Sequence, residues 1–168
     1  MERARHGDAD AWEALYVGLY PRLLACATRR LGSQLARDAV SETMTRAVAG
    51  SRRFRPGGVF DAWVFGICRN VILEQLRSAR RRGGGWLEPV SEEPDPAEEV
   101  EASADRAAVR AAFAELSPAD QEVLELRVVG GLSAEAVAQV LHRKPGAVRM
   151  AQSRALARLR STLEQVTT

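Results

Sequence analysis

Apolar residues recur at steps of three and four along most of the chain, and this spacing predicts an all-α protein without strands. The first predicted helix begins at a capping box formed by Asp10 and Glu13, bends at Pro21 and ends at Gly32. A second helix is expected over about residues 35–49, because its apolar residues keep to one side.

The loop that follows, SRRFRPGG, contains one proline and two glycines, which break both the helical and the strand period. A long helix is then predicted from about Phe60 to Arg82, where three consecutive glycines stop it. We expect these three helices to pack as a small bundle. Residues 1–82 therefore form the predicted N-terminal domain.

A linker is predicted over residues 83–103, where three glycines, three prolines and seven acidic residues replace the helical pattern. Helical spacing resumes near Ala104. Ser117 is expected to cap the next helix, with Pro118 at its first position. The predicted fold is therefore two small helical domains joined by a flexible acidic linker, and the second domain covers residues 104–168.

The last two predicted helices have the layout of a helix-turn-helix. A short helix capped by Ser133 spans Ala134 to Leu141, the segment HRKPG interrupts the pattern, and a basic helix covers about residues 147–162. In this layout the second helix lies in the major groove of DNA. Its apolar residues can pack on the first helix, which leaves basic residues outward. The residues expected to contact duplex DNA are Arg143, Lys144, Arg149, Ser153, Arg154 and Arg158.

The alternative is an ordinary surface helix with positive charge near its C-terminus, which the helix dipole favours. That alternative accounts for Arg158 and Arg160. It does not account for Arg143, Lys144 and Arg149 at the opposite end, where the dipole disfavours cations unless an anion binds. The pattern therefore favours a nucleic-acid surface.

A second basic cluster lies in the predicted loop and third helix, where arginines are interleaved with aromatic residues. This combination suits single-stranded nucleic acid, because bases stack on the rings while the backbone follows the positive charge. The alternative is that Trp63 and Ile67 are core residues, but Phe54 lies in the loop between arginines. Asn70 could bond a base edge. The candidate residues are Phe54, Arg55, Phe60, Trp63, Arg69, Asn70, Arg77, Arg80 and Arg81.

The net charge of +2 conceals a strong asymmetry along the chain. Residues 1–82 carry 15 basic and 8 acidic side chains, residues 83–115 carry 2 and 9, and residues 116–168 carry 7 and 5. Lys144 is the single lysine among 24 basic residues. Guanidinium groups bind phosphate through paired donors, so both basic blocks suit nucleic acid.

Other classes of function lack support. No apolar run approaches the roughly 18 residues of a membrane span, and the N-terminus lacks a secretory signal, so we expect a cytoplasmic protein with no membrane insertion of its own. Cys26 and Cys68 have neither CxxC spacing nor a nearby histidine, which predicts buried free thiols without metal or cofactor. His6 and His142 lie far apart, and WLEP follows the three glycines instead of a GK[ST] phosphate loop, so an enzyme is not expected.

Five segments carry a resemblance to a known family. They are AWEALYVGLYPRLLACATRRLG, DAVSETMTRAV, FDAWVFGICRNVILEQLR, LSPADQEVLELRVVGGLSAEAVAQVL and GAVRMAQSRALARLR. In this order and spacing they resemble the successive conserved regions of the extracytoplasmic-function (ECF) type of sigma factor, the promoter-specificity subunit of bacterial RNA polymerase, over nearly the whole chain. One segment alone would be weak evidence, since many regulators share a helix-turn-helix, but five in the family's order are strong evidence.

The resemblance implies contacts with RNA polymerase core. The helix holding Asp38, Glu42, Thr43 and Arg46 matches the helix that docks on the clamp helices of the largest subunit. The flap of the second-largest subunit is also an implied partner. From spacing alone, Asp38, Glu42 and Arg46 could equally form pairs within their own helix. The acidic linker corresponds to the segment threaded towards the active-site cleft.

The resemblance also implies promoter contacts. Phe54 and Asn70 match residues that capture a flipped base of the melted non-template strand at the minus-10 element, and Trp63 matches the tryptophan that opens that helix. Arg149 and Arg154 match residues that contact the duplex minus-35 element.

The predicted function is transcription initiation: the chain binds core polymerase, recognises both promoter elements and promotes melting. Met150 and Ala151 stand where many relatives have Ser-Arg, so the resemblance does not fix the promoter sequence. No sensory domain follows Thr168, and an anti-sigma factor is therefore the expected regulator. The main alternative is a free-standing regulator that binds operator DNA without polymerase.

Overall fold

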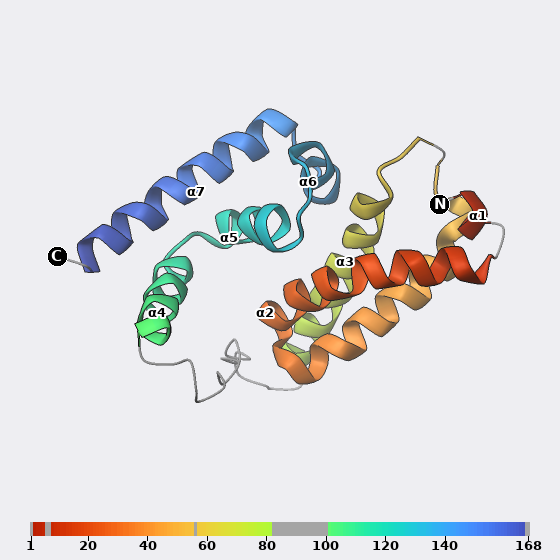
Figure 1. Cartoon of the computed structure of the whole chain (residues 1–168), viewed down its shortest axis with the longest axis horizontal. Helices are drawn as coiled ribbons and strands as arrows, with labels where there is room; N and C mark the ends of the chain where they lie inside the picture. Colours follow the sequence, from red (N-terminus) through yellow and green to blue (C-terminus); the bar gives the residue numbers. More distant parts are fainter. Residues whose placement is uncertain (1, 6–7, 56, 82–100, 167–168) are drawn as a thin grey trace.

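The computed structural model describes residues 2–5, 8–55, 57–81 and 101–166, and within these ranges the chain is helical without strands (Figure 1). The all-α prediction is therefore confirmed for the described part. The predicted linker lies outside it, except for its last three residues, which begin α4. The elements are α1 (Glu2–Arg5), α2 (Ala9–Gly50), η1 (Ser51–Arg53), α3 (Phe60–Arg81), α4 (Glu101–Ala114), α5 (Pro118–Leu124), η2 (Glu125–Val129), α6 (Ala134–Leu141) and α7 (Pro145–Val166).

Helix α2 joins the first two predicted helices into one element. The helical dihedrals break at Gly32, with φ 77° and ψ 163°, a backbone conformation that a glycine adopts without strain, and the chain changes direction there (Figure 1). The dihedrals stay helical at Pro21, so the break in the helix lies at Gly32 and not at the proline. The predicted capping box is also wrong, because the cap is Asp8, whose carboxylate accepts a hydrogen bond from the Ala11 N–H at 3.0 Å.

The N-terminal core forms where α3 packs on α2. Val64, Cys68 and Val71 recur at steps of four and three on one side of α3, and all three are buried. On α2, Leu23 and Val40 are completely inaccessible to solvent. Both cysteines are free and buried, as the sequence predicts.

The C-terminal half begins its helices at the predicted caps. The hydroxyl groups of Ser117 and Ser133 each accept a backbone hydrogen bond at the start of α5 and α6. Helix α5 ends at Leu124, earlier than expected, and the π-helical segment η2 continues the chain to Val129. Helix α7 begins at Pro145 and extends to Val166, so it is longer at both ends than predicted.

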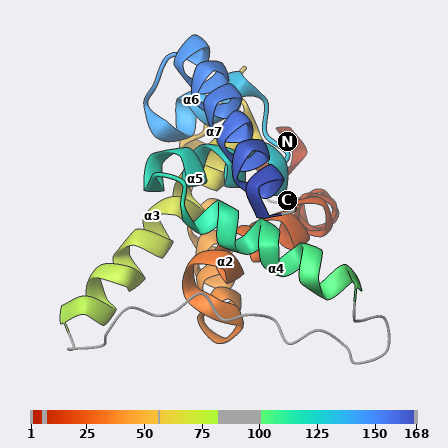
Figure 2. The same ribbon diagram turned by 90° about the vertical axis from the view of Figure 1, so that its left-hand side faces the viewer.

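Helices α6 and α7 form the predicted helix-turn-helix. His142 ends α6 in a left-handed conformation with φ 52°, which allows the sharp change of direction. Val137 of α6 and Val148 and Ala155 of α7 are fully buried. Helix α7 lies against α4, α5 and α6 (Figure 2).

The two halves are not separate in this structure, because one buried apolar cluster extends from α2 and α3 into η2, α6 and α7. The contact between them is made chiefly where α6 packs on α3 (Figure 1). A smaller cluster of Leu116, Leu124 and Ala155, with Phe113 of α4 packed against it, joins α4, α5 and α7.

Candidate nucleic-acid interface

Helix α7 carries several basic side chains on its exposed surface. The buried positions Val148, Ala151 and Ala155 fix the rotation of the helix, because they recur at steps of three and four and face α4 to α6. All six residues predicted to contact duplex DNA are exposed, either on α7 or in the break before it. Their contact with DNA stays a prediction.

One of these residues is held by an ion pair that the sequence did not predict. The Arg149 guanidinium lies 2.8 Å from a carboxylate oxygen of Glu135 on α6, and both side chains are well exposed. A hydrogen bond from its own backbone N–H, and then the contact with Arg149, hold the pKa of Glu135 below its usual range. Because the pair is exposed, we expect it to orient Arg149 and to add little stability.

The loop and third helix form an aromatic cluster. The ring of Phe54 lies 5.5 Å from that of Phe60 and 5.3 Å from that of Trp63, centroid to centroid, and Phe54 is only 8% exposed. Neighbouring rings therefore cover Phe54 in this arrangement, and its predicted contact with a flipped base stays a prediction. Phe60 and Trp63 are half-buried, so they offer the accessible edges of the cluster.

The polar residues predicted beside this cluster fall into two groups. Asn70 of α3 is exposed, and so are the arginines near the loop and the end of α3. Arg69, predicted to face nucleic acid, instead donates to the Glu122 carboxylate of α5 at 2.9 Å. This ion pair occupies Arg69 in the free chain, and its contact with nucleic acid stays a prediction. The exposed arginines are Arg55, Arg77, Arg80 and Arg81.

The predicted polymerase-binding face of α2 is an ion-paired surface. Arg46 bridges two helices, since it lies 2.7 Å from Glu42 on α2 and 2.9 Å from Glu74 on α3. Hydrogen bonds to Glu74 and then Glu42 raise the pKa of Arg46. Asp38 is exposed. Thr43 is fully buried and donates its hydroxyl to the Ala39 carbonyl at 2.7 Å, so it is not accessible in this arrangement, and its role in polymerase binding stays a prediction.

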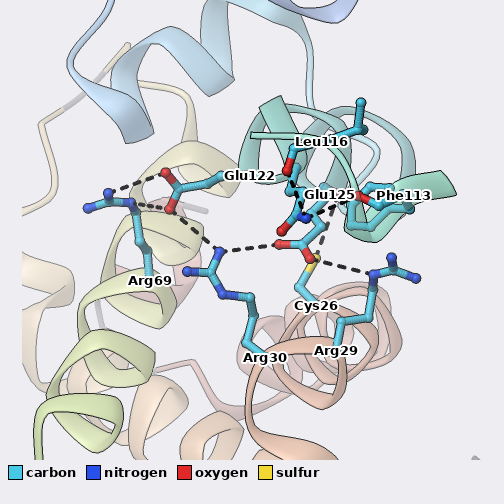
Figure 3. A network of polar contacts seen from close by, with 9 residues as sticks. Cys26, Arg29, Arg30, Arg69, Phe113, Leu116, Glu122 and Glu125 are labelled. Atoms are coloured by element: carbon cyan, nitrogen blue, oxygen red, sulfur yellow. Dashed lines mark hydrogen bonds and ion pairs between the residues drawn. The ribbon is translucent and has the colours of Figure 1, made fainter. Parts of the chain in front are cut away.

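Between the two halves lies a polar network that sequence reasoning missed (Figure 3). Arg30 of α2 lies 3.3 Å from Glu125 and 3.8 Å from Glu122, and Arg29 lies 3.6 Å from Glu125. The Arg29 guanidinium also covers the ring of Phe113 at 4.6 Å. No sequence signal marks these pairs, because their partners lie about a hundred residues apart.

Glu125 is the buried member of this network, with only 7% of its surface exposed. Burial raises the pKa of its carboxyl, and the guanidinium groups of Arg30 and Arg29 only partly oppose this. Burial also raises the pKa of Cys26 to about 12 and that of Cys68 to about 11. Both thiols are therefore protonated at neutral pH and are poor nucleophiles in this arrangement.

Glu125→Gln is expected to stabilise the chain at pH 7. Because burial raises the pKa of this carboxyl above its usual value of 4.5, its contribution to stability is fully present below that pH and is lost as pH rises through the folded-state pKa. The gain in melting temperature of the variant over the unchanged chain should therefore shrink as pH falls from 8 to 5. Circular dichroism melts of both proteins measure it. A variant that is less stable at every pH would contradict this, because it would mean that the ion pairs of Glu125 with Arg29 and Arg30 stabilise the chain by more than burial of the charged carboxylate destabilises it.

Other kinds of site find no support among the described residues. None of the described helices combines the length and apolar character of a membrane span. Within the same ranges, His, Cys, Asp and Glu form no cluster of three or more that could hold a metal ion.

Comparison with known protein families gives two matches in chain order. Sigma-70 region 2 matches residues 15–82, and Sigma-70, region 4, matches residues 106–159. The first covers α2 and α3 up to the end of the predicted N-terminal domain, and the second covers the helix-turn-helix.

Two curated relatives extend the likeness to the whole chain. The ECF RNA polymerase sigma factor ShbA of Streptomyces griseus is 34% identical over 98% of this chain and 94% of its own length. The ECF RNA polymerase sigma factor SigL of Mycobacterium tuberculosis is 33% identical over 95% of each chain. Among solved structures, the sigma factor RpoE of Bartonella quintana, in complex with the anti-sigma factor NepR, is 25% identical with a TM-score of 0.75, over 93% of this chain and 98% of its own.

Proposed function

The chain belongs to the ECF sigma factors of RNA polymerase, and on this premise we propose which of its surfaces bind promoter DNA, core polymerase and a regulator. A sigma factor binds core enzyme and directs it to promoters. The observation that best supports this assignment is the packing of α7, which buries its apolar side and leaves its basic side chains exposed. The proposal assigns these residues to the duplex minus-35 element.

The aromatic cluster and the arginines around it are assigned to the melted minus-10 strand. Phe60 and Trp63 present ring edges, and the exposed Asn70 lies two turns beyond Trp63 on α3. Such a surface stabilises separated strands by binding unstacked bases more tightly than paired ones, which shifts the equilibrium towards open DNA. No bond is made or broken in this step, so the chain acts by binding and not as an enzyme.

Core polymerase is assigned to the face of α2 that carries Asp38, Glu42 and Arg46. The bridge from Arg46 to Glu74 fixes this face against α3, so it is a preformed surface that carries both acidic and basic groups. An anti-sigma factor is the proposed regulator. The support is the RpoE structure, which was solved with such a factor bound and aligns over most of both chains.

Run-off transcription tests the function. With purified core polymerase and a template library from the cognate genome, the chain is expected to give promoter-dependent transcripts that core polymerase alone does not give. Absence of any such product would contradict the function. The alternative of a free-standing regulator predicts instead a stable, specific DNA complex at physiological salt without polymerase.

Asn70→Ala is expected to slow open-complex formation several-fold while leaving polymerase binding unchanged, because an exposed side chain that bonds a base edge contributes only after strand separation. Permanganate reactivity of thymines in the melted region, measured with the reconstituted holoenzyme, checks this. Val17→Ala, a change at an exposed position in the first part of α2, serves as the control. Equal thymine reactivity for all three proteins would remove Asn70 from the minus-10 surface.

A further inference from the structure

The side of α7 that points away from the core has an apolar residue at its centre. At about 100° per residue, Met150 lies about 160° around the helix from the buried Val148. Arg149 and Arg154 lie about 100° and about 120° from Val148, in opposite directions around the helix. Met150 therefore points away from the core, and an arginine flanks it on each side.

No neighbour on the outward side of α7 covers Met150, which is 60% exposed. The residues that share its direction are small and exposed, namely Gly146, Ser153 and Ala157. A Cβ atom added at Gly146 would meet no other atom within 4 Å, so the space in front of the first turn is open. Single exposed apolar residues are common on protein surfaces. Met150 differs from them in its position, at the centre of the predicted recognition surface.

Two polar contacts fix the rotation of α7 and hold Met150 in this direction. Arg127 of η2 donates from Nε to the side-chain oxygen of Gln152 at 2.8 Å, and it also donates to the Leu132 carbonyl oxygen. Arg149 donates to Glu135 of α6 at 2.8 Å, which draws its guanidinium group towards α6. The apolar side chain of Met150 is thus presented by a helix that is anchored to both η2 and α6.

An apolar side chain at this place matches one group in the major groove of DNA. The residues near the N-terminus of a recognition helix contact base edges there, and Met150 lies in the second turn of α7, which begins at Pro145. Among the base edges in that groove, thymine presents a methyl group at C5, and apolar side chains contact it. The thioether chain of methionine is flexible and polarisable, so it can pack closely on such a group.

We infer that Met150 is a specificity-determining residue, which packs on the methyl group of a thymine in the minus-35 element. The inference rests on the proposed function, because that function assigns α7 to this element. Adenine, guanine and cytosine present no methyl group in the major groove, so the contact favours one base at one position. The flanking arginines attract the DNA but do not make this distinction.

Replacement of thymine by uracil tests the contact, because uracil pairs as thymine does and lacks only the methyl group. The probe is a promoter duplex recovered by run-off transcription from the template library, with uracil placed at one thymine of the minus-35 element at a time. Holoenzyme that contains the unchanged chain should lose affinity about three- to fivefold at one position, which corresponds to one buried methyl group. Holoenzyme with Met150→Ala should no longer distinguish the two duplexes at that position.

Three further variants provide controls. Met150→Leu keeps an apolar side chain and should retain a preference for thymine, whereas Met150→Gln, which has a similar length but is polar, should lose it. Leu156→Ala removes another exposed apolar side chain of α7, and it should keep the full preference. Because both positions are exposed, the helical content and melting temperature of all variants should match those of the unchanged chain.

The outcomes separate failure of this inference from failure of the proposed function. If the unchanged chain gives no promoter-dependent transcripts with core polymerase, both fail. If it transcribes, the function stands, and the role of Met150 is overturned by a minus-35 element without thymine on either strand, by uracil tolerated at every position, or by a uracil effect that persists in Met150→Ala. Weaker binding of Met150→Ala to core polymerase without DNA would also overturn it, because the residue would then face a protein.

Discussion

Phe65→Ala is expected to lower the free energy of unfolding by about 3–5 kcal/mol, because it removes a large buried ring and leaves a cavity. Phe65 is 1% exposed and contributes to the core shared by both halves. For a chain of this size the change corresponds to a fall in melting temperature of roughly 6–20 °C. Thermal melts followed by circular dichroism measure it.

The position of Phe65 makes the expected loss in the free energy of unfolding larger than the loss from removing its ring contacts alone. The Arg22 guanidinium lies over this ring, and the ring lies close to Gly130, so its removal also loosens the contact between the halves. Val17→Ala provides the control, since Val17 is 67% exposed on α2 and its truncation should change stability by no more than about 0.5 kcal/mol. A shift at Phe65 as small as that of the control would contradict the shared core.

Arg149→Ala combined with Arg154→Ala is expected to weaken holoenzyme binding to a promoter that contains the minus-35 element by about 30-fold or more. Each arginine that bonds a base edge typically contributes about 1–3 kcal/mol to recognition. Both side chains are exposed on the outward face of α7, and neither contributes to the core, so the fold should be retained. Titration of promoter DNA with reconstituted holoenzyme measures the loss.

Arg160→Ala is the matched control, because Arg160 is exposed on the same helix but lies beyond the predicted contact residues. It should change affinity much less than the double variant. Loss of Arg149 also leaves Glu135 without its ion-pair partner, but this pair is exposed and should affect stability little. An unaltered upstream footprint in the double variant would remove α7 from minus-35 recognition.

The spacing of apolar residues and the helix caps predicted the helices and the buried side of α7, because both depend on residues that are close together in the chain. The caps at Ser117 and Ser133 need only a hydroxyl beside the first turn, and the burial of Val148 and Ala155 follows from helical periodicity. The same rules misplaced the start of α2, because Asp8 and Asp10 are both acceptable caps and only the fold selects one.

The contacts between the halves could not be predicted in the same way. Arg69 and Glu122 are separated by 53 residues, and Arg22 and Gly130 by 108, in a chain with many arginines and acids. The sequence places Phe54 in a loop between arginines, whereas its neighbours in space are Phe60 and Trp63. Tertiary packing thus decided which candidate residues are accessible.

The central claim is that the chain, bound to polymerase, holds separated strands at one promoter element and paired strands at the other. The most direct measurement compares holoenzyme binding to two DNAs of the same sequence, one fully paired and one with a mismatched bubble over the minus-10 element. The account predicts at least tenfold tighter binding to the bubble, and it predicts that this preference falls in the Asn70→Ala variant. Equal affinity for the two DNAs would contradict it.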